Sequence, residues 1–120
     1  MKVLLINGSP HVDGVIALAL KELSDTLNRC DIETEIIHVG NKDIRGCIAC
    51  RSCKKTGKCV FDDCVNEIAF KLKDADGLVV GAPVYYGSAN STVVSLLTKL
   101  FYSINYDLSM KVGASVVSAR

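Results

Sequence analysis

The chain has 120 residues, of which 49% are hydrophobic and 22% are charged, and its formal net charge is +1. This length and composition favour one compact domain, and the near-neutral charge gives neither a basic stripe for nucleic acid nor a polybasic patch for a membrane surface. No apolar run approaches the roughly 18 residues that a membrane span needs. We therefore expect no nucleic-acid partner and no membrane partner.

Strands and helices alternate along the chain, beginning with a strand at residues 2–7. This segment is a continuous apolar run of mostly branched residues, which is typical of a strand buried on both faces of a sheet. A helix follows, and Cys30 at its expected end is interpreted as a small packed side chain. Residues 33–39 form a second, more polar strand, which suits the edge of a sheet. The apolar residues at helical spacing are Ile16, Leu20, Leu23 and Leu27.

The second half of the chain continues the alternation. A helix begins near Asp62 or Asp63, whose carboxylates suit a helix N-terminus. An apolar third strand occupies residues 77–82, a third helix begins near Ser91, and a fourth strand occupies residues 112–119. Such alternation requires right-handed crossovers and a parallel sheet with helices on both faces. We therefore predict an α/β fold, a doubly wound parallel sheet of the flavodoxin type, with its ligand crevice at the carboxyl ends of the first and third strands.

The loop at residues 7–14, after the first strand, predicts an anion site. Its small residues let the backbone close around a ligand, Ser9 offers a hydroxyl, and the next helix presents unpaired N–H groups. Gly8 and Gly14 are its only glycines, so it is neither a GxGxxG loop nor a Walker loop. A plain strand-to-helix turn is the alternative, and His11 alone would be a solvated loop histidine.

The loop at residues 83–90, after the third strand, predicts a site for a planar ligand. Tyr85 and Tyr86 stand between Pro83 and Gly87 and form a stiff aromatic platform, whose neighbouring N–H groups can reach a polar rim. Packed loop tyrosines are the alternative. Because both loops meet at one crevice, flavin mononucleotide (FMN), with one phosphate and one flat ring system, is the simplest ligand.

Four cysteines fall in the loop at residues 46–61, with the spacing Cys-x2-Cys-x2-Cys-x5-Cys. The first three match the opening of a ferredoxin ligand run, and zinc would be satisfied by the same sulfurs. Metal-free thiols and structural disulfides stay open as alternatives. The N-terminal residues show no secretion-signal pattern, so we expect a cytoplasmic protein with reduced thiols. The candidate metal ligands are Cys47, Cys50, Cys53 and Cys59.

Three motifs follow one another in the chain: Ile6-Asn7-Gly8-Ser9-Pro10, then the cysteine run with Asp62-Asp63, then Gly81-Ala82-Pro83-Val84-Tyr85-Tyr86-Gly87. Together they resemble the NAD(P)H-dependent FMN reductase superfamily, and within it the iron–sulfur flavoproteins. The resemblance implies FMN bound by the two loops, NAD(P)H as the hydride donor, and assembly as a homodimer or homotetramer. In some members of the family the cysteine motif holds a [4Fe–4S] cluster.

The first loop departs from the family pattern Gly-Ser-Pro-Arg-x-x-Gly-Asn-Thr. This chain has His11 in place of the arginine and Val15-Ile16 in place of Asn-Thr. Each lost hydrogen bond costs about 1–3 kcal/mol, so we expect FMN to bind roughly tens to thousands of times more weakly than in typical relatives. The resemblance implies these cofactor-binding residues: Ser9, His11, Gly14, Val15, Ile16, Pro83, Val84, Tyr85, Tyr86, Gly87, Ser118 and Arg120.

The second departure concerns length, because relatives continue beyond Arg120 through a flavin-contacting loop, another helix and a fifth strand. We therefore expect residues 1–120 to form a single, C-terminally incomplete FMN-binding domain that lacks this strand and helix. The fourth strand would then be an uncovered apolar edge, which is a liability for aggregation or strand exchange.

These observations indicate an FMN-dependent oxidoreductase that accepts hydride from NAD(P)H and passes electrons to an unknown acceptor, through a [4Fe–4S] cluster if the cysteines hold one. No acid–base residue is assigned, because the chemistry resides in the flavin. The cysteine loop should emerge on the flavin side of the sheet, which predicts a short electron path within or across subunits. The alternatives are a non-enzymatic flavodoxin-like electron carrier, which usually docks through strongly charged faces, and a cofactor-free thiol or zinc module.

Overall fold

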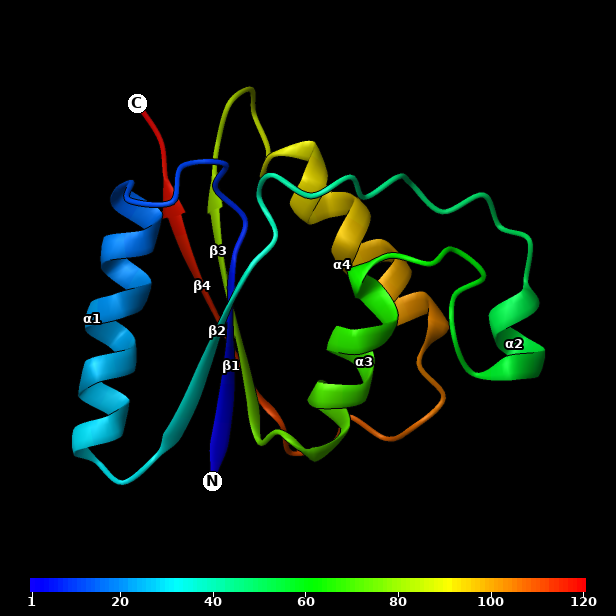
Figure 1. Ribbon diagram of the computed structural model, residues 1–120, viewed down its shortest axis with the longest axis horizontal. Coiled ribbons are helices and arrows are strands. Elements are labelled where there is room, and N and C mark those ends of the chain that lie inside the picture. The colour runs from blue at the N-terminus through cyan, green and yellow to red at the C-terminus, as the bar shows by residue number, and fades with distance from the viewer.

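The computed structural model describes all of residues 1–120. Its strands are β1 (Lys2–Asn7), β2 (Glu33–His38), β3 (Gly77–Pro83) and β4 (Val112–Ser118). Its helices are α1 (Val15–Arg29), α2 (Ser52–Thr56), α3 (Cys64–Asp74) and α4 (Ser91–Ser103). Helix α1 covers one face of the sheet, α3 and α4 cover the other, and the short α2 stands apart from it (Figure 1).

The sheet has the strand order β2-β1-β3-β4, with every neighbouring pair parallel. This is the flavodoxin order through its fourth strand, so the predicted fold is confirmed. The central strands β1 and β3 are buried along most of their length, as their continuous apolar runs predict. The more polar β2 lies at one edge, as expected, and β4 lies at the other.

Side chains of β1 alternate between two hydrophobic cores. Leu4 and Ile6 join the larger core beneath α3 and α4, whereas Leu5 packs beneath α1. Helix α1 approaches β3 closely, because a Cβ atom on Gly81 would lie 2.6 Å from Cγ2 of Ile16. The two cores together fix the sheet between its helices and hold the carboxyl ends of β1 and β3 side by side.

Two details differ from the sequence predictions. Cys30 was expected to be packed, but it is exposed, because it is the C-cap residue of α1 and projects beyond the last turn. The cysteine loop was expected to be irregular, but it contains α2, a turn too short for hydrophobic periodicity to reveal. Val112 and Val117 of β4 are exposed within residues 1–120, and the uncovered edge at the fourth strand stays a prediction. None of the helices is long and apolar enough to cross a membrane.

Candidate functional site

A cleft of about 740 Å³ opens at the carboxyl ends of β1, β3 and β4, and we call it the carboxyl-edge cleft. The loops after β1 and β3, which both line it, lie at the same end of the sheet, at the top of the view in Figure 1. The structure brings all of the predicted cofactor-binding residues to this one cleft, and their role in binding stays a prediction. The lining residues are Ser9, His11, Gly14, Val15, Ile16, Pro83, Val84, Tyr85, Tyr86, Gly87, Ser118, Ala119 and Arg120.

The loop after β1 is braced by its own side chains. The Ser9 N–H donates to Oδ1 of Asn7 at 3.0 Å, and the His11 N–H donates to Oγ of Ser9 at 3.2 Å. Ser9 is only 4% exposed, so it has a structural role that the sequence did not reveal. Its hydroxyl hydrogen is not used in either bond and stays available for a ligand in the carboxyl-edge cleft.

The first turn of α1 presents free N–H groups to the same cleft. Gly14 is the N-cap residue and has no side chain that could cap the helix. The N–H groups of Val15, Ile16 and Ala17 donate to no acceptor in the protein. Unpaired N–H groups and the positive end of the helix dipole favour an anion at this position.

The loop after β3 is a tight turn that displays its two tyrosines. Val84 and Ala89 pair as an isolated antiparallel bridge, and Gly87 takes the left-handed conformation, with φ of 64°. Tyr85 is 63% exposed and Tyr86 is 98% exposed. The rings therefore stand free at the rim of the cleft, so the alternative of packed loop tyrosines is wrong.

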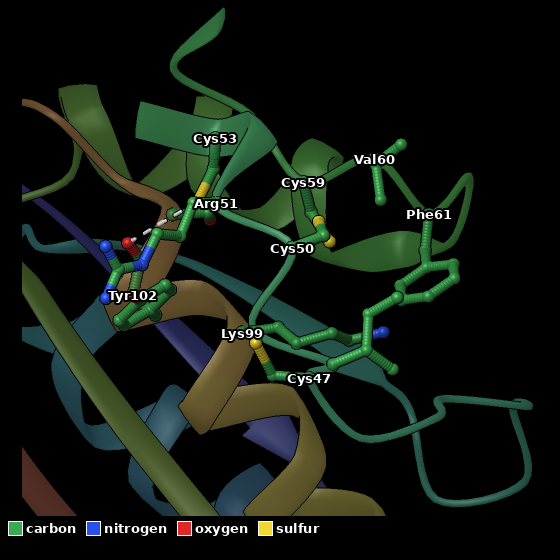
Figure 2. Close-up of a pocket in the computed structure, with 11 residues that line it drawn as sticks. Cys47, Cys50, Arg51, Cys53, Cys59, Val60, Phe61, Lys99 and Tyr102 are labelled. Atoms are coloured by element: carbon green, nitrogen blue, oxygen red, sulfur yellow. Dashed lines mark hydrogen bonds between the residues drawn. The ribbon is translucent and has the colours of Figure 1, made fainter. Parts of the chain in front are cut away.

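The four cysteines of the 46–61 loop surround a second, much smaller cavity of about 20 Å³, which we call the cysteine cavity (Figure 2). It is also lined by residues from α4. The four sulfurs are the donor set that an iron–sulfur cluster or a zinc ion requires. No three of the protein's cysteine, histidine and acidic side chains are grouped closely enough to hold a metal ion. The thiols thus fit such a centre by their chemistry, whereas their present spacing and the small volume of the cavity do not.

All six cysteines are free thiols, and their environments differ. Hydrogen bonds from the N–H and the hydroxyl of Ser52 hold the pKa of the Cys50 thiol below its ordinary value. Burial raises the pKa of Cys64, which lies outside the cavity at the start of α3. Cys50 also stands between two residues in the left-handed region, Ala49 with φ of 55° and Arg51 with φ of 61°. The exposed part of the loop is therefore conformationally strained as well as chemically distinct.

A buried ion pair fixes the far end of the cysteine loop. The Lys99 side chain, 1% exposed on α4, pairs with Asp63, and Asp63 also caps α3 by accepting from the Val65 N–H at 3.0 Å. Two cations lie over the ring of Phe61, with Nζ of Lys99 5.3 Å and Cζ of Arg45 4.6 Å from its centroid. These contacts join the end of the loop to both α3 and α4.

A second contact holds Cys59 directly. Oδ1 of Asn66 accepts from the Cys59 N–H at 2.8 Å, and Nδ2 of Asn66 donates to the Cys59 carbonyl at 2.9 Å. Sequence reasoning missed both Asn66 and Lys99. Lys99 had a signal, because it follows Leu96 by three residues and precedes Leu100 on the apolar face of the helix.

The carboxyl-edge cleft and the cysteine cavity have no lining residue in common. The chain leaves β2 on the edge that carries the cleft, as expected, but then crosses to the α3 and α4 side (Figure 1). Asn90, before α4, contacts the loop after β1, whereas Lys99 and Tyr102, near the end of α4, line the cysteine cavity. The two sites are therefore separate in this chain, and the short electron path, within or across subunits, stays a prediction.

Comparison with known sequences identifies a family. The family described as NADPH-dependent FMN reductase matches residues 1–120. An iron–sulfur flavoprotein of Methanocaldococcus jannaschii is 38% identical over 117 residues, which cover 97% of this chain and 61% of that protein. An iron–sulfur flavoprotein of Methanosarcina thermophila is 33% identical over 122 residues, which cover 97% of this chain and 62% of that protein. The chain therefore spans somewhat less than two thirds of these relatives.

Solved structures share the fold at lower sequence identity. An NAD(P)H:quinone oxidoreductase from Methanothermobacter marburgensis superposes with a TM-score of 0.77 at 14% identity, covering 99% of this chain and 66% of that one. RosB with the bound intermediate 8-demethyl-8-formylriboflavin-5'-phosphate superposes with a TM-score of 0.75 at 16% identity, covering 100% of this chain and 52% of that one. At these identities the likeness establishes the fold alone.

Proposed function

Because the chain belongs to the NADPH-dependent FMN reductase family, we propose that residues 1–120 form a single FMN-binding domain of a flavin oxidoreductase. The oxidoreductase accepts hydride from NAD(P)H and passes the electrons to a separate acceptor. The observation that carries this proposal is the carboxyl-edge cleft, which joins free N–H groups of α1 to the aromatic loop after β3. Its volume of about 740 Å³ lies within the usual range for ligand pockets.

The residues of the cleft suit the two ends of FMN. The N–H groups of Val15, Ile16 and Ala17, with the Ser9 hydroxyl, hold the phosphate by hydrogen bonds and by the helix dipole. Tyr85 and Tyr86 border the ring system at the rim of the cleft. Bound FMN supplies the redox chemistry, because it accepts a hydride and releases electrons singly or in pairs. The protein's task is to hold the ring at this cleft.

Binding and reduction are tested together. Fluorescence quenching on titration with FMN measures the dissociation constant, and NADH or NADPH is then added without oxygen while the flavin absorption bands are recorded. We expect FMN to bind and its bands to bleach. Binding without bleaching by either nucleotide would favour a flavodoxin-like electron carrier. If folded protein at high micromolar concentration did not quench FMN fluorescence, the remaining interpretation would be a thiol or zinc module.

Replacing the three residues that differ from the family's pattern in and after the loop following β1 sharpens this test. The triple change His11→Arg, Val15→Asn and Ile16→Thr restores a charge and two polar side chains beside the free N–H groups of α1. Each restored hydrogen bond is worth about 1–3 kcal/mol, so we expect FMN to bind at least about tenfold more tightly. Unchanged affinity would mean that the phosphate binds elsewhere.

We propose further that Cys47, Cys50, Cys53 and Cys59 hold a [4Fe–4S] cluster after the loop rearranges around it. The proposal is supported by the four thiols that line one cavity and by the names of the archaeal relatives. Such a cluster would supply a one-electron relay. The rearrangement falls on the exposed half of the loop, because Cys59 is held by Asn66 and the chain beyond it by Lys99.

Anaerobic purification followed by iron and sulfide analysis tests the cluster. We expect iron and acid-labile sulfide in a ratio near one to one, and a large loss of both in Cys59→Ser. Cys30→Ser is the matched control, because Cys30 is exposed at the end of α1, remote from the cavity. Zinc in place of iron, or no metal at all, would contradict the cluster but not the flavin site.

We also propose a homodimer or homotetramer. Tyr86 at the rim of the cleft is almost fully exposed, and exposed apolar surface is typical of contacts between subunits. Light scattering on a size-exclusion column measures the mass directly. A monomer at high micromolar concentration would contradict this proposal.

A further inference from the structure

Three consecutive carbonyl groups in the loop after β1 are each held by a hydrogen bond from a different part of the fold. The Asn7 carbonyl accepts from the Val39 N–H at 2.9 Å, and the Gly8 carbonyl accepts from Nδ2 of Asn90 at 2.7 Å. The Ser9 carbonyl accepts from Nε2 of His38 at 2.7 Å. None of the three donor residues, Val39, Asn90 and His38, lines the carboxyl-edge cleft. Their effect on a ligand is therefore indirect.

We propose that His38 is a positioning residue for recognition of the flavin phosphate, because it keeps the Ser9 carbonyl turned away from the carboxyl-edge cleft. This inference rests on the proposed FMN site and assigns a residue outside that site. A carbonyl oxygen carries partial negative charge and would repel a phosphate that it faced. Held carbonyls and free N–H groups together make the loop selective for an anion.

The contact at Ser9 is both directional and close. A carbonyl can only accept a hydrogen bond, so Nε2 of His38 carries the hydrogen and donates it. The chain then passes directly over the same carbonyl, because a Cβ atom on Gly40 would lie 1.9 Å from the Ser9 oxygen and 2.6 Å from the Pro10 nitrogen. The Ser9 peptide is thus held by a hydrogen bond from β2 and by backbone contact from the residues that follow β2.

The neighbouring peptide is held just as firmly. The Gly8 N–H donates to the Gly81 carbonyl at 2.8 Å, while the Gly8 carbonyl is held by the buried Asn90. With Gly8 fixed on both sides, rotation of the loop is left mainly to the peptide between Ser9 and Pro10. Pro10 has no N–H that could hold this peptide, so the bond from His38 is its only hydrogen bond.

The test compares FMN with riboflavin, which has the same ring system but no phosphate. In His38→Leu, we expect the dissociation constant for FMN to rise about 5- to 20-fold, as for the loss of one hydrogen bond that orients the site. Riboflavin affinity should change less than about twofold. In His38→Gln the side-chain amide can donate to the Ser9 carbonyl, so most of the FMN affinity should return.

Two further variants keep the test decisive. His38→Asn is too short to reach the carbonyl and keeps a polar side chain at the sheet edge, so it should lose FMN affinity even if the leucine variant does not fold. Lys42→Gln is the matched control, because Lys42 is exposed beyond β2 and its side chain makes no hydrogen bond. Thermal unfolding of each variant shows whether the fold is intact.

The possible outcomes separate the inference from the function on which it rests. The positioning role would be overturned if the affinities for FMN and riboflavin fell equally. It would also be overturned if neither affinity fell in folded His38→Leu and His38→Asn. Either result would leave the proposed FMN site standing. Wild-type protein that binds neither flavin would overturn both. Selective loss of FMN that is restored in His38→Gln supports the inference, because a merely structural role would weaken both flavins alike.

Discussion

The carboxyl-edge cleft offers main-chain groups to a ligand, whereas the cysteine cavity offers side chains. Around the cleft, the free groups of α1 are main-chain N–H groups, and the loop after β1 is held by main-chain bonds such as Gly8 to Gly81 together with side chains such as Asn90 and His38. Around the cavity, single side chains carry the contacts: Lys99 to Asp63, Asn66 to Cys59, and Lys54 to the Tyr102 carbonyl. The difference indicates that changes to the exposed side chains of the cleft are tolerated better than changes to the side chains around the cavity.

The largest expected effect is at the buried ion pair of the cysteine region. Lys99→Met leaves the carboxylate of Asp63 largely buried without its cation, so we expect the free energy of unfolding to fall by about 3–5 kcal/mol in urea denaturation. Adding Asp63→Asn should recover part of the loss, because asparagine removes the charge and can still cap α3. Lys21→Met is the control, since Lys21 forms an exposed pair with Asp25. Equal losses in Lys99→Met and Lys21→Met would contradict the structural role of the buried pair.

The next effect concerns the cleft, where a side chain added at Gly40 would clash with the backbone of the loop after β1. Gly40→Ala places a methyl group within 1.9 Å of the Ser9 oxygen, so the loop after β1 has to move. We expect a loss of about 1–3 kcal/mol in the free energy of unfolding, together with weaker FMN binding. Gly113→Ala in β4 is matched to it, because no atom lies within 4 Å of the added methyl group. Equally small losses in the free energy of unfolding for both substitutions would contradict the close packing of this loop.

An effect of similar size distinguishes side chains in the two regions. Asn66→Ala removes both bonds to the Cys59 backbone, and we expect about 1–3 kcal/mol of destabilisation with faster hydrogen exchange at Cys59. Tyr86→Ala in the cleft should change the free energy of unfolding by less than about 0.5 kcal/mol, because that side chain is almost fully exposed. The opposite order of these two losses would reverse the comparison between cavity and cleft.

The smallest effect is kinetic and concerns pH. Because the bonds from Ser52 lower the pKa of Cys50, its thiolate forms at lower pH than an ordinary thiol, and its alkylation rate should level off earlier as pH rises. Cys64 should behave in the opposite way, because burial raises its pKa. Mass spectrometry of metal-free protein treated with iodoacetamide from pH 6 to 9 measures both profiles. Ser52→Ala should shift the Cys50 profile to higher pH and leave the Cys64 profile in place.

The sequence allowed the fold and the cleft to be predicted because their signals are local. Branched apolar runs mark β1 and β3, Asp63 marks the start of α3, and a parallel sheet brings the loops after β1 and β3 together. The contacts that complete the site join residues far apart in sequence. His38 and Ser9 are 29 positions apart, and Gly8 and Asn90 are 82 apart, so no pattern along the chain predicts either pair.

The cysteine cavity was harder to predict for a different reason. Spacing predicts that four thiols can meet, but the buried position of Lys99 is set by the packing of α4 against α3, and lysine is normally exposed. Cys30 was predicted to be packed because free cysteine is often buried, yet a C-cap position leaves it in solvent. In both cases the general preference of the residue type was overridden by its place in the fold.

Helix α4 gives the molecule a mechanical connection between its two regions. Asn90, immediately before the helix, holds the Gly8 carbonyl of the loop after β1, and Lys99 and Tyr102 border the thiols 9 and 12 residues further on. A helical segment of 13 residues behaves as a nearly rigid rod about 20 Å long, seated here in a close-packed core. A ligand that displaced one end of this rod would strain the contacts at the other end. By thermodynamic reciprocity, such strain would make ligand binding at the loop after β1 and the conformation of the thiol loop depend on each other to the same extent.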